Sequence, residues 1–260
     1  ELIGEYYRIT HDVPEKQEAR FRAYIANGPA RGELILDALS PPPQSTIVDI
    51  GCGSGGFLVA AARKGCCVVG VDIGLRWLVI CAKRLAEEGA NIELVCADIA
   101  APPFAGQSFD AAIAADLMEH IADPAPAATA IAGMIGDNGK IFVSGVNRYT
   151  LAPYPLAGLW GVGFLPGFLR RRYITMRTGL DTLRYARLAS PFGTTRLFRR
   201  AGFEIISAAP LNVAVPVKKI GARMRGHPIA VYNKLRTIHG IKQLLVLVGP
   251  AFELVARKKA

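Results

Sequence analysis

Two patterns of hydrophobic and polar positions alternate along most of the chain. Short apolar runs rich in β-branched residues are typical of buried strands, and longer runs with apolar positions every three to four residues are typical of helices. The strands that the first pattern predicts are 46–50, 67–72, 92–98, 109–116, 140–146, 204–210 and 252–258. The helices that the second predicts are 31–39, 57–65, 75–89, 128–136 and 194–202. This alternation predicts an α/β fold with a doubly wound, parallel sheet.

Two irregular stretches interrupt the alternation. Residues 151–169 hold no charged side chain but contain three prolines and four glycines, and Arg170–Arg172 follow directly. Prolines and glycines in this number disfavour a regular helix. The second stretch, 211–243, is irregular and basic.

The length and composition fit one domain that carries these stretches as insertions. Of the 260 residues, 51% are hydrophobic and 20% are charged, which is typical of a chain that forms a core rather than a disordered one. We expect one domain over 1–260, with insertions at 147–190 and 211–243. Aromatic and polar residues near the start predict an N-terminal helical cap over 1–40.

Charge is divided unevenly along the chain. The formal net charge is +10, with −7 in residues 1–147 and +17 in residues 148–260. Such asymmetry indicates that the C-terminal part faces an anionic partner, either a lipid surface or nucleic acid. A merely solvated basic face is the alternative.

Cysteine usage indicates a reducing compartment. The five cysteines include no C-x-x-C pair, so neither a disulfide framework nor a zinc site is expected. The sequence does not open with a basic and then apolar stretch of the signal-peptide type. We therefore expect a cytoplasmic protein.

A glycine-rich loop follows the first predicted strand. Glycines at 51, 53, 55 and 56 stand where the strand turns into a helix, and they let the backbone approach a cofactor beside the helix N-terminus. The spacing of Gly51, Gly53 and Gly56 also satisfies G-x-G-x-x-G, the dinucleotide fingerprint. The motif therefore also allows an enzyme that uses a nicotinamide or flavin cofactor.

Three features favour S-adenosylmethionine (SAM) over a dinucleotide. Asp49, two residues before the first glycine, would repel a pyrophosphate, whereas SAM carries a cationic sulfonium and an amino group. Asp98 and Ile99 follow the third strand, where they suit an adenine amino group. The ending, in which the sixth strand leads through an insertion to a last strand, is the third feature. Asp72 binds ribose hydroxyls in both classes and does not discriminate.

Four segments together resemble the successive motifs of class I SAM-dependent methyltransferases. They are VDIGCGSGGF, GVDI, CADIAAPPF and FDAAIAADLMEHI, in matching order and spacing. The resemblance implies a Rossmann-like seven-stranded sheet with a reversed last strand, and SAM bound across the carboxyl ends of strands one, two and four. The residues that it assigns to the cofactor are Asp49, Gly51, Cys52, Gly53, Gly55, Asp72, Ile73, Asp98, Ile99 and Ala115.

Asp116, Glu119 and His120 follow the fourth strand, where this class binds its acceptors. The stretch resembles the ubiquinone-pathway O-methyltransferases, in which these positions hold a divalent metal near the acceptor hydroxyl. The resemblance therefore implies the same metal ligands here, although Asp116 replaces a longer glutamate. His120 is our candidate for the base that deprotonates the acceptor. A purely structural Glu119–His120 pair is the alternative.

The segment 151–173 is either a hydrophobic lid or an interfacial segment. In the second case Trp160 and Phe164 would lie at the headgroup level, with Arg170–Arg172 on anionic lipid. The ubiquinone-pathway relatives carry a membrane-contacting insertion at this place, so we favour peripheral membrane association. Nucleic acid is disfavoured because the aromatic residues do not interleave with the basic ones.

The sequence thus predicts methyl transfer from SAM to a small apolar or lipid-like acceptor, at oxygen. We expect the acceptor between Asp116–His120, the N-terminal residues Tyr6 and Tyr7, and the segment 151–173. Methylation of a polar natural product or of RNA are the alternatives, and a non-catalytic SAM-binding subunit is a third.

Overall fold

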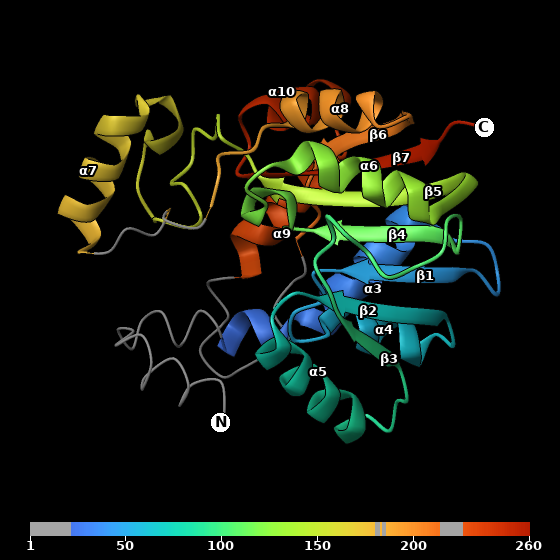
Figure 1. The fold of residues 1–260 in the computed structure, drawn as a ribbon. Coiled ribbons are helices and arrows are strands. Elements are labelled where there is room, and N and C mark those ends of the chain that lie inside the picture. Colours follow the sequence, from blue (N-terminus) through green and yellow to red (C-terminus); the bar gives the residue numbers. More distant parts are fainter. Residues whose placement is uncertain (1–21, 180–182, 184–185, 214–225) are drawn as a thin grey trace.

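The computed structural model describes residues 22–179, 183, 186–213 and 226–260. Its centre is a seven-stranded sheet in the order β3-β2-β1-β4-β5-β7-β6 (Figure 1). The strands are β1 (Thr46–Ile50), β2 (Cys67–Asp72), β3 (Glu93–Cys96), β4 (Phe109–Ala115), β5 (Ile135–Val146), β6 (Phe203–Pro210) and β7 (Ala251–Lys258). Every strand that the sequence predicts is present, so the predicted α/β class is confirmed.

The strand order reverses next to β1. This strand pairs in parallel with β2 on one side and with β4 on the other. Strand β7 lies between β5 and β6 and runs antiparallel to both, which confirms the reversed last strand. Because ligands of open α/β sheets bind at such a reversal, the carboxyl ends of β1 and β4 are the expected site.

Helices cover both faces of the sheet. The helical segments are α3 (Gly28–Leu39), α4 (Gly56–Arg63), α5 (Leu75–Glu87), η1 (Met118–His120), α6 (Pro124–Met134), η2 (Val162–Phe164), α7 (Gly167–Thr178), α8 (Pro191–Arg200), α9 (Gly226–Leu235) and α10 (His239–Val248). Helices α3, α4 and α5 share one buried cluster with the sheet, whereas α6 and α8 share the other. Residues 22–26 are also helical, and the rest of the predicted N-terminal cap before them lies outside the described residues.

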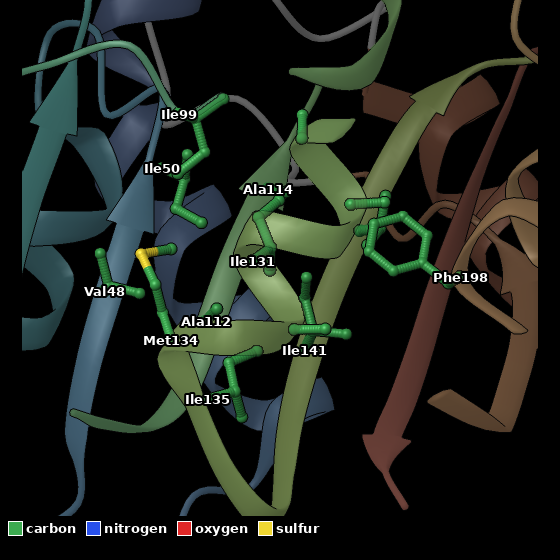
Figure 2. Packing of buried hydrophobic residues seen from close by; sticks show 14 of the residues in the cluster. Val48, Ile50, Ile99, Ala112, Ala114, Ile131, Met134, Ile135, Ile141 and Phe198 are labelled. Atoms are coloured by element: carbon green, nitrogen blue, oxygen red, sulfur yellow. The ribbon is translucent and has the colours of Figure 1, made fainter. Parts of the chain in front are cut away.

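The central strands are largely apolar because both of their faces are buried. Figure 2 shows Ile131 of α6 and Phe198 of α8 packed near Ala112 of β4 and Ile141 of β5. The alternate residue Ile113 faces the other cluster. Strands buried on both sides read as continuous apolar runs, which is why their sequences predict them well.

One predicted helix boundary is wrong. Ile135 and Gly136, predicted as the end of a helix, belong to β5, and Ile135 pairs with Phe109 of β4. The helix is α6, which begins earlier, at Pro124, where the Asp123 side chain caps it by accepting a hydrogen bond from Ala125 N. A short apolar run at a helix–strand junction fits either element, so its pattern does not fix the boundary.

The first insertion builds a small core of its own. Tyr154, Val162 and Ile174 pack together, and Tyr154 forms a β-bridge with Leu159. Helix α7 of this insertion stands away from the helices that cover the sheet (Figure 1). The expected irregular character is thus correct before α7 but not within it.

The second insertion is helical where the sequence suggested irregular structure. Within 211–243, α9 and the first half of α10 are regular helices. The prediction failed because a basic composition does not oppose helix formation, since lysine and arginine are good helix formers. The end of α10 contacts the start of the first insertion: Asn147 Nδ2 donates to Leu247 O at 3.0 Å, and Leu151 N donates to Val248 O at 2.9 Å.

Candidate cofactor and acceptor site

The glycine loop between β1 and α4 is tied to β2. Gly51 N and Cys52 N both donate to Val71 O, at 2.8 and 3.0 Å. Gly51 adopts a φ of +73°, and a Cβ there would lie 2.8 Å from Leu117 Cδ1. Position 51 therefore requires glycine, for its backbone angle and for the space above it.

Asp72 holds the other side of this loop. It ends β2, where its Oδ2 accepts a hydrogen bond from Gly53 N at 2.9 Å and its Oδ1 accepts one from Gly74 N at 2.7 Å. A carboxylate oxygen has a second lone pair, so both oxygens can still accept from the hydroxyls of a ligand. This geometry fits the ribose role that the sequence suggested.

Close packing of α3 on α4 brings new residues to the loop. A Cβ on Gly56 would lie 2.7 Å from Gly28 Cα, so the two helices meet at their glycines. This approach places Tyr24 and Arg31 over the loop, where they help to line a cavity of about 200 Å³. Of the ten residues assigned to the cofactor, five line it: Asp49, Gly51, Cys52, Gly53 and Ala115.

Asp49 contributes a titratable carboxyl to the lining of this cavity. Its side chain is buried, and burial together with the Asp72 charge raises the pKa of the carboxyl to about 7, against the opposing effect of Arg31. A buried carboxyl of this kind is stabilised in its charged form by a cationic ligand group. The cavity thus favours a ligand that brings a positive charge to Asp49.

Arg31 is the functional candidate that the sequence did not reveal. One of its guanidinium nitrogens lies 2.7 Å from Asp116 Oδ2 and 3.2 Å from Ser144 Oγ. Another donates to Tyr24 OH at 3.3 Å. Its partner Asp116 is distant in sequence, so no local pattern predicts the pair. The one local signal is a charged residue between two small residues on an apolar helix.

Asp98 and Ile99, which the sequence assigns to the adenine, lie at the carboxyl end of β3. Asp98 is exposed and its Oδ1 accepts a hydrogen bond from Ala100 N at 2.9 Å, which orders the turn. Ile99 is buried, while Ile73 after β2 is exposed. Ile73 and Asp98 thus offer an exposed apolar side chain and an exposed hydrogen-bond acceptor after the paired strands β2 and β3.

Asp116, Glu119 and His120 do not form a metal centre. Asp116 turns toward Arg31 with a φ of +52°, and its Oδ1 accepts a hydrogen bond from Ser144 Oγ at 2.8 Å. Within the described ranges no three histidine, cysteine or acidic side chains form a group that could hold a metal ion. The donor set therefore does not fit the metal that the resemblance implied, because Asp116 is committed to a cation already present.

Glu119 and His120 occupy contrasting environments in η1. Glu119 is 3% exposed, and burial with the Asp116 charge raises the pKa of its carboxyl to about 8. His120 is exposed, and its N donates to Leu117 O at 2.8 Å. The exposed imidazole remains our candidate base, and the buried carboxyl is suited to donating a hydrogen bond at neutral pH.

The first insertion presents apolar side chains to solvent. Trp160, Phe164, Phe168 and Met176 are all more than half exposed. A shallow apolar groove of about 420 Å³ runs among its residues, with Arg172 at the edge. Among the helices that the structure describes, none has the length and apolar character to cross a bilayer. Tyr6 and Tyr7, expected near the acceptor, lie outside the described residues.

The chain has relatives of known family. Residues 47–139 match the family model described as "Methyltransferase domain". The ubiquinone biosynthesis O-methyltransferase of Saccharophagus degradans is 28% identical over 191 residues, which cover 72% of this chain and 75% of that protein. The protein of the same name from Paracidovorax citrulli is 29% identical over 192 residues, or 73% and 75% of the two chains.

Solved structures share the fold at low identity. The [4+2]-cyclase SpnF superposes with a TM-score of 0.62 at 16% identity, covering 99% of this chain and 95% of its own. A geranyl diphosphate C-methyltransferase from Streptomyces coelicolor A3(2) gives 0.58 at 16% identity, covering 89% and 80%. At these identities the likeness shows the architecture alone.

Proposed function

Since this chain is a class I SAM-dependent methyltransferase, distantly homologous to ubiquinone biosynthesis O-methyltransferases, we propose that it methylates an oxygen of a small apolar or lipid-like acceptor. The chain acts in this proposal as one catalytic domain, whose two insertions serve the acceptor. The observation that carries the proposal is the cavity beside the glycine loop, which offers opposite charges at Asp49 and Arg31.

The two charges match the amino-acid end of SAM. Asp49 suits its ammonium group and Arg31 suits its carboxylate, because a charge-assisted pair gains most in a partly desolvated site. Asp72 would accept from the ribose hydroxyls. Asp98 would bind the adenine together with the exposed Ile73, in place of Ile99, which is buried. When bound, SAM supplies an electrophilic methyl group on its sulfonium.

This chain's own residues position and deprotonate the acceptor. Asp116 holds Arg31 through the 2.7 Å ion pair, so it acts on the cofactor side rather than as a metal ligand. His120, exposed at the end of η1, takes the proton that the attacking oxygen loses. In-line methyl displacement needs chiefly alignment and exclusion of water, which the apolar segment 151–173 supplies.

The acceptor class is argued from the insertion. Its exposed aromatic residues lie among exposed arginines at 171, 172 and 177, a combination suited to an anionic lipid surface. Peripheral attachment would bring the enzyme to acceptors dissolved in the bilayer. The ubiquinone-pathway likeness supports this acceptor class, since those relatives are O-methyltransferases by name.

The test is one transfer assay with methyl-labelled SAM and a total extract of the source cells. The products are separated into organic, aqueous and nucleic-acid fractions, and Asp72→Ala is run in parallel as the cofactor-site control. Label in the organic fraction, absent from the control, is expected. Label in the nucleic-acid fraction would refute the lipid-like acceptor and assign the basic C-terminal part to RNA. Label in the aqueous fraction would favour a polar acceptor.

A further inference from the structure

Three buried side-chain atoms of the described residues have no hydrogen-bond partner: Glu119 Oε2, Tyr154 OH and Tyr232 OH. Such atoms are uncommon in folded proteins because each one has lost its water without a replacement. Two of the three belong to segments that the proposed function places around the acceptor. Glu119 follows β4, and Tyr154 lies in the first insertion.

Glu119 and the cluster that contains Tyr154 both adjoin the end of β5. A Cβ on Gly145 of β5 would come within 3.3 Å of Glu119 Oε2. The next residue, Val146, packs against the cluster that contains Tyr154. The two groups also interact electrostatically: burial raises the pKa of Tyr154, and the Glu119 charge raises it further. Glu119 and Tyr154 therefore flank one stretch of β5.

Tyr154 lies in apolar surroundings, whereas the charges of Asp116 and Arg31 act on the Glu119 carboxyl. Tyr154 is 1% exposed and packs with Val162 and Ile174. Arg170 is the charged group that acts on Tyr154 from α7, but it donates its own hydrogen bonds to Val162 O and Leu165 O. The Tyr154 hydroxyl is thus a hydrogen-bond donor without an acceptor among the described residues, and Glu119 Oε2 is a second buried polar atom without a partner there. Their complement is an oxygen with free lone pairs on an otherwise apolar molecule.

We propose that the Tyr154 hydroxyl, together with the Glu119 carboxyl, binds an oxygen of the methyl acceptor and so determines which acceptors the enzyme uses. The inference rests on the proposed function for the location of the acceptor. It gives the first insertion a specific chemical task, in addition to covering the site. Because Tyr154 is closed over by the insertion, the acceptor enters by displacing part of that segment.

The test compares Tyr154 with Tyr232, the other tyrosine of the described residues whose buried hydroxyl has no hydrogen-bond partner. Tyr154→Phe and Tyr232→Phe each remove a buried hydroxyl without a partner, so both variants are expected to melt at or above the wild-type temperature. Only Tyr154→Phe is expected to lower transfer, by about tenfold at limiting acceptor, through a raised KM for the acceptor. SAM affinity, measured by calorimetry, stays unchanged in both variants. The acceptor source is the organic extract of the source cells.

A second pair of variants tests Glu119 as a hydrogen-bond donor. Glu119→Gln keeps a donor at this position and is expected to retain more transfer than Glu119→Leu, which keeps none. Equal loss in both variants would contradict the donor role.

The inference and the proposed function fail in different ways. If Tyr154→Phe melts higher yet transfers label as well as wild type, the hydroxyl is a structural remnant and the inference is wrong. If wild type labels the aqueous or nucleic-acid fraction instead, the lipid-like acceptor is wrong, and the same Tyr154→Phe comparison on that fraction decides the inference. A wild type that labels no fraction overturns both.

Discussion

Four carboxyl groups near the site differ in what compensates their charge. Asp72 accepts two backbone N–H bonds, and Asp116 is paired with Arg31 and accepts from Ser144. Asp49 and Glu119 are buried, and their pKa values are raised to about 7 and about 8. These contacts hold Asp72 and Asp116 in place, whereas Asp49 and Glu119 change charge near neutrality. Asp49 therefore responds both to pH and to a cationic ligand group.

Replacing Arg31 by methionine is expected to weaken SAM binding. The variant removes the cation that suits the SAM carboxylate, and a charge-assisted hydrogen bond of this kind contributes about 1.5–3 kcal/mol, or roughly 10–150-fold in Kd. Calorimetric titration with SAM measures the change, and the exposed Lys83→Met on α5 serves as the control. Equal SAM affinity in the two variants would exclude Arg31 from the cofactor site.

Stability without ligand is expected to fall as pH rises from about 4 to 8. Because the folded-state pKa values of Asp49 and Glu119 lie above their ordinary values, the folded state binds more protons than the unfolded state in this window. The loss is on the order of a few kcal/mol and levels off above both folded-state values. Urea unfolding at several pH values measures it. The double variant Asp49→Asn/Glu119→Gln should show a flatter profile, and an unchanged slope would contradict the assignment.

At the scale of elements, local features were predictable and distant pairings were not. The glycine loop and Asp72 lie on consecutive elements, so their contact follows from β1 and β2 being parallel neighbours. Arg31 contacts Asp116 because α3 packs on α4 against the face of the sheet. No local sequence pattern encodes this packing. Tyr154 depends on the fold of an insertion that lacks any periodic signal. Side chains that come together through tertiary packing are thus the ones that the sequence could not reveal.

The contact between α3 and α4 is expected to be sensitive to one methyl group. In Gly56→Ala the new Cβ would lie 2.7 Å from Gly28 Cα, so the helices must separate, at a cost of about 1–3 kcal/mol. The shift also moves Arg31, so SAM affinity should fall. Gly133→Ala in α6 meets nothing within 4 Å and should stabilise by up to about 1 kcal/mol. Thermal unfolding and SAM titration of the two variants check both statements, and stabilisation by both would refute this packing.

In the whole molecule, positive charge and exposed apolar side chains occur in the same part of the sequence. The net charge is −7 in residues 1–147 and +17 in residues 148–260. The largest exposed apolar side chains of the first insertion lie in this basic part, and α7 extends away from the sheet (Figure 1). The cofactor cavity is built on the acidic part instead. The cofactor cavity and the exposed apolar side chains of the first insertion thus belong to parts of the sequence with opposite net charge.

This division leads to a prediction for vesicle binding. The protein should sediment with vesicles that contain phosphatidylglycerol and much less with pure phosphatidylcholine, and high salt should release it, because its arginines contribute about 1 kcal/mol each near an anionic surface. Trp160→Ser/Phe168→Ser should weaken binding to the anionic vesicles several-fold. These side chains are 64% and 76% exposed, so the fold should not suffer.

Phe192→Ser provides the matched control for the vesicle experiment. This side chain is 63% exposed on α8, outside the first insertion, so the variant removes one exposed aromatic ring, as at Phe168, without touching the proposed contact. If both variants sediment as wild type does, charge alone holds the protein at the vesicle. If wild type does not sediment at all, the apolar segment serves as a lid over the site and the basic part is a solvated face. Loss of binding confined to Trp160→Ser/Phe168→Ser would identify the first insertion as the membrane contact.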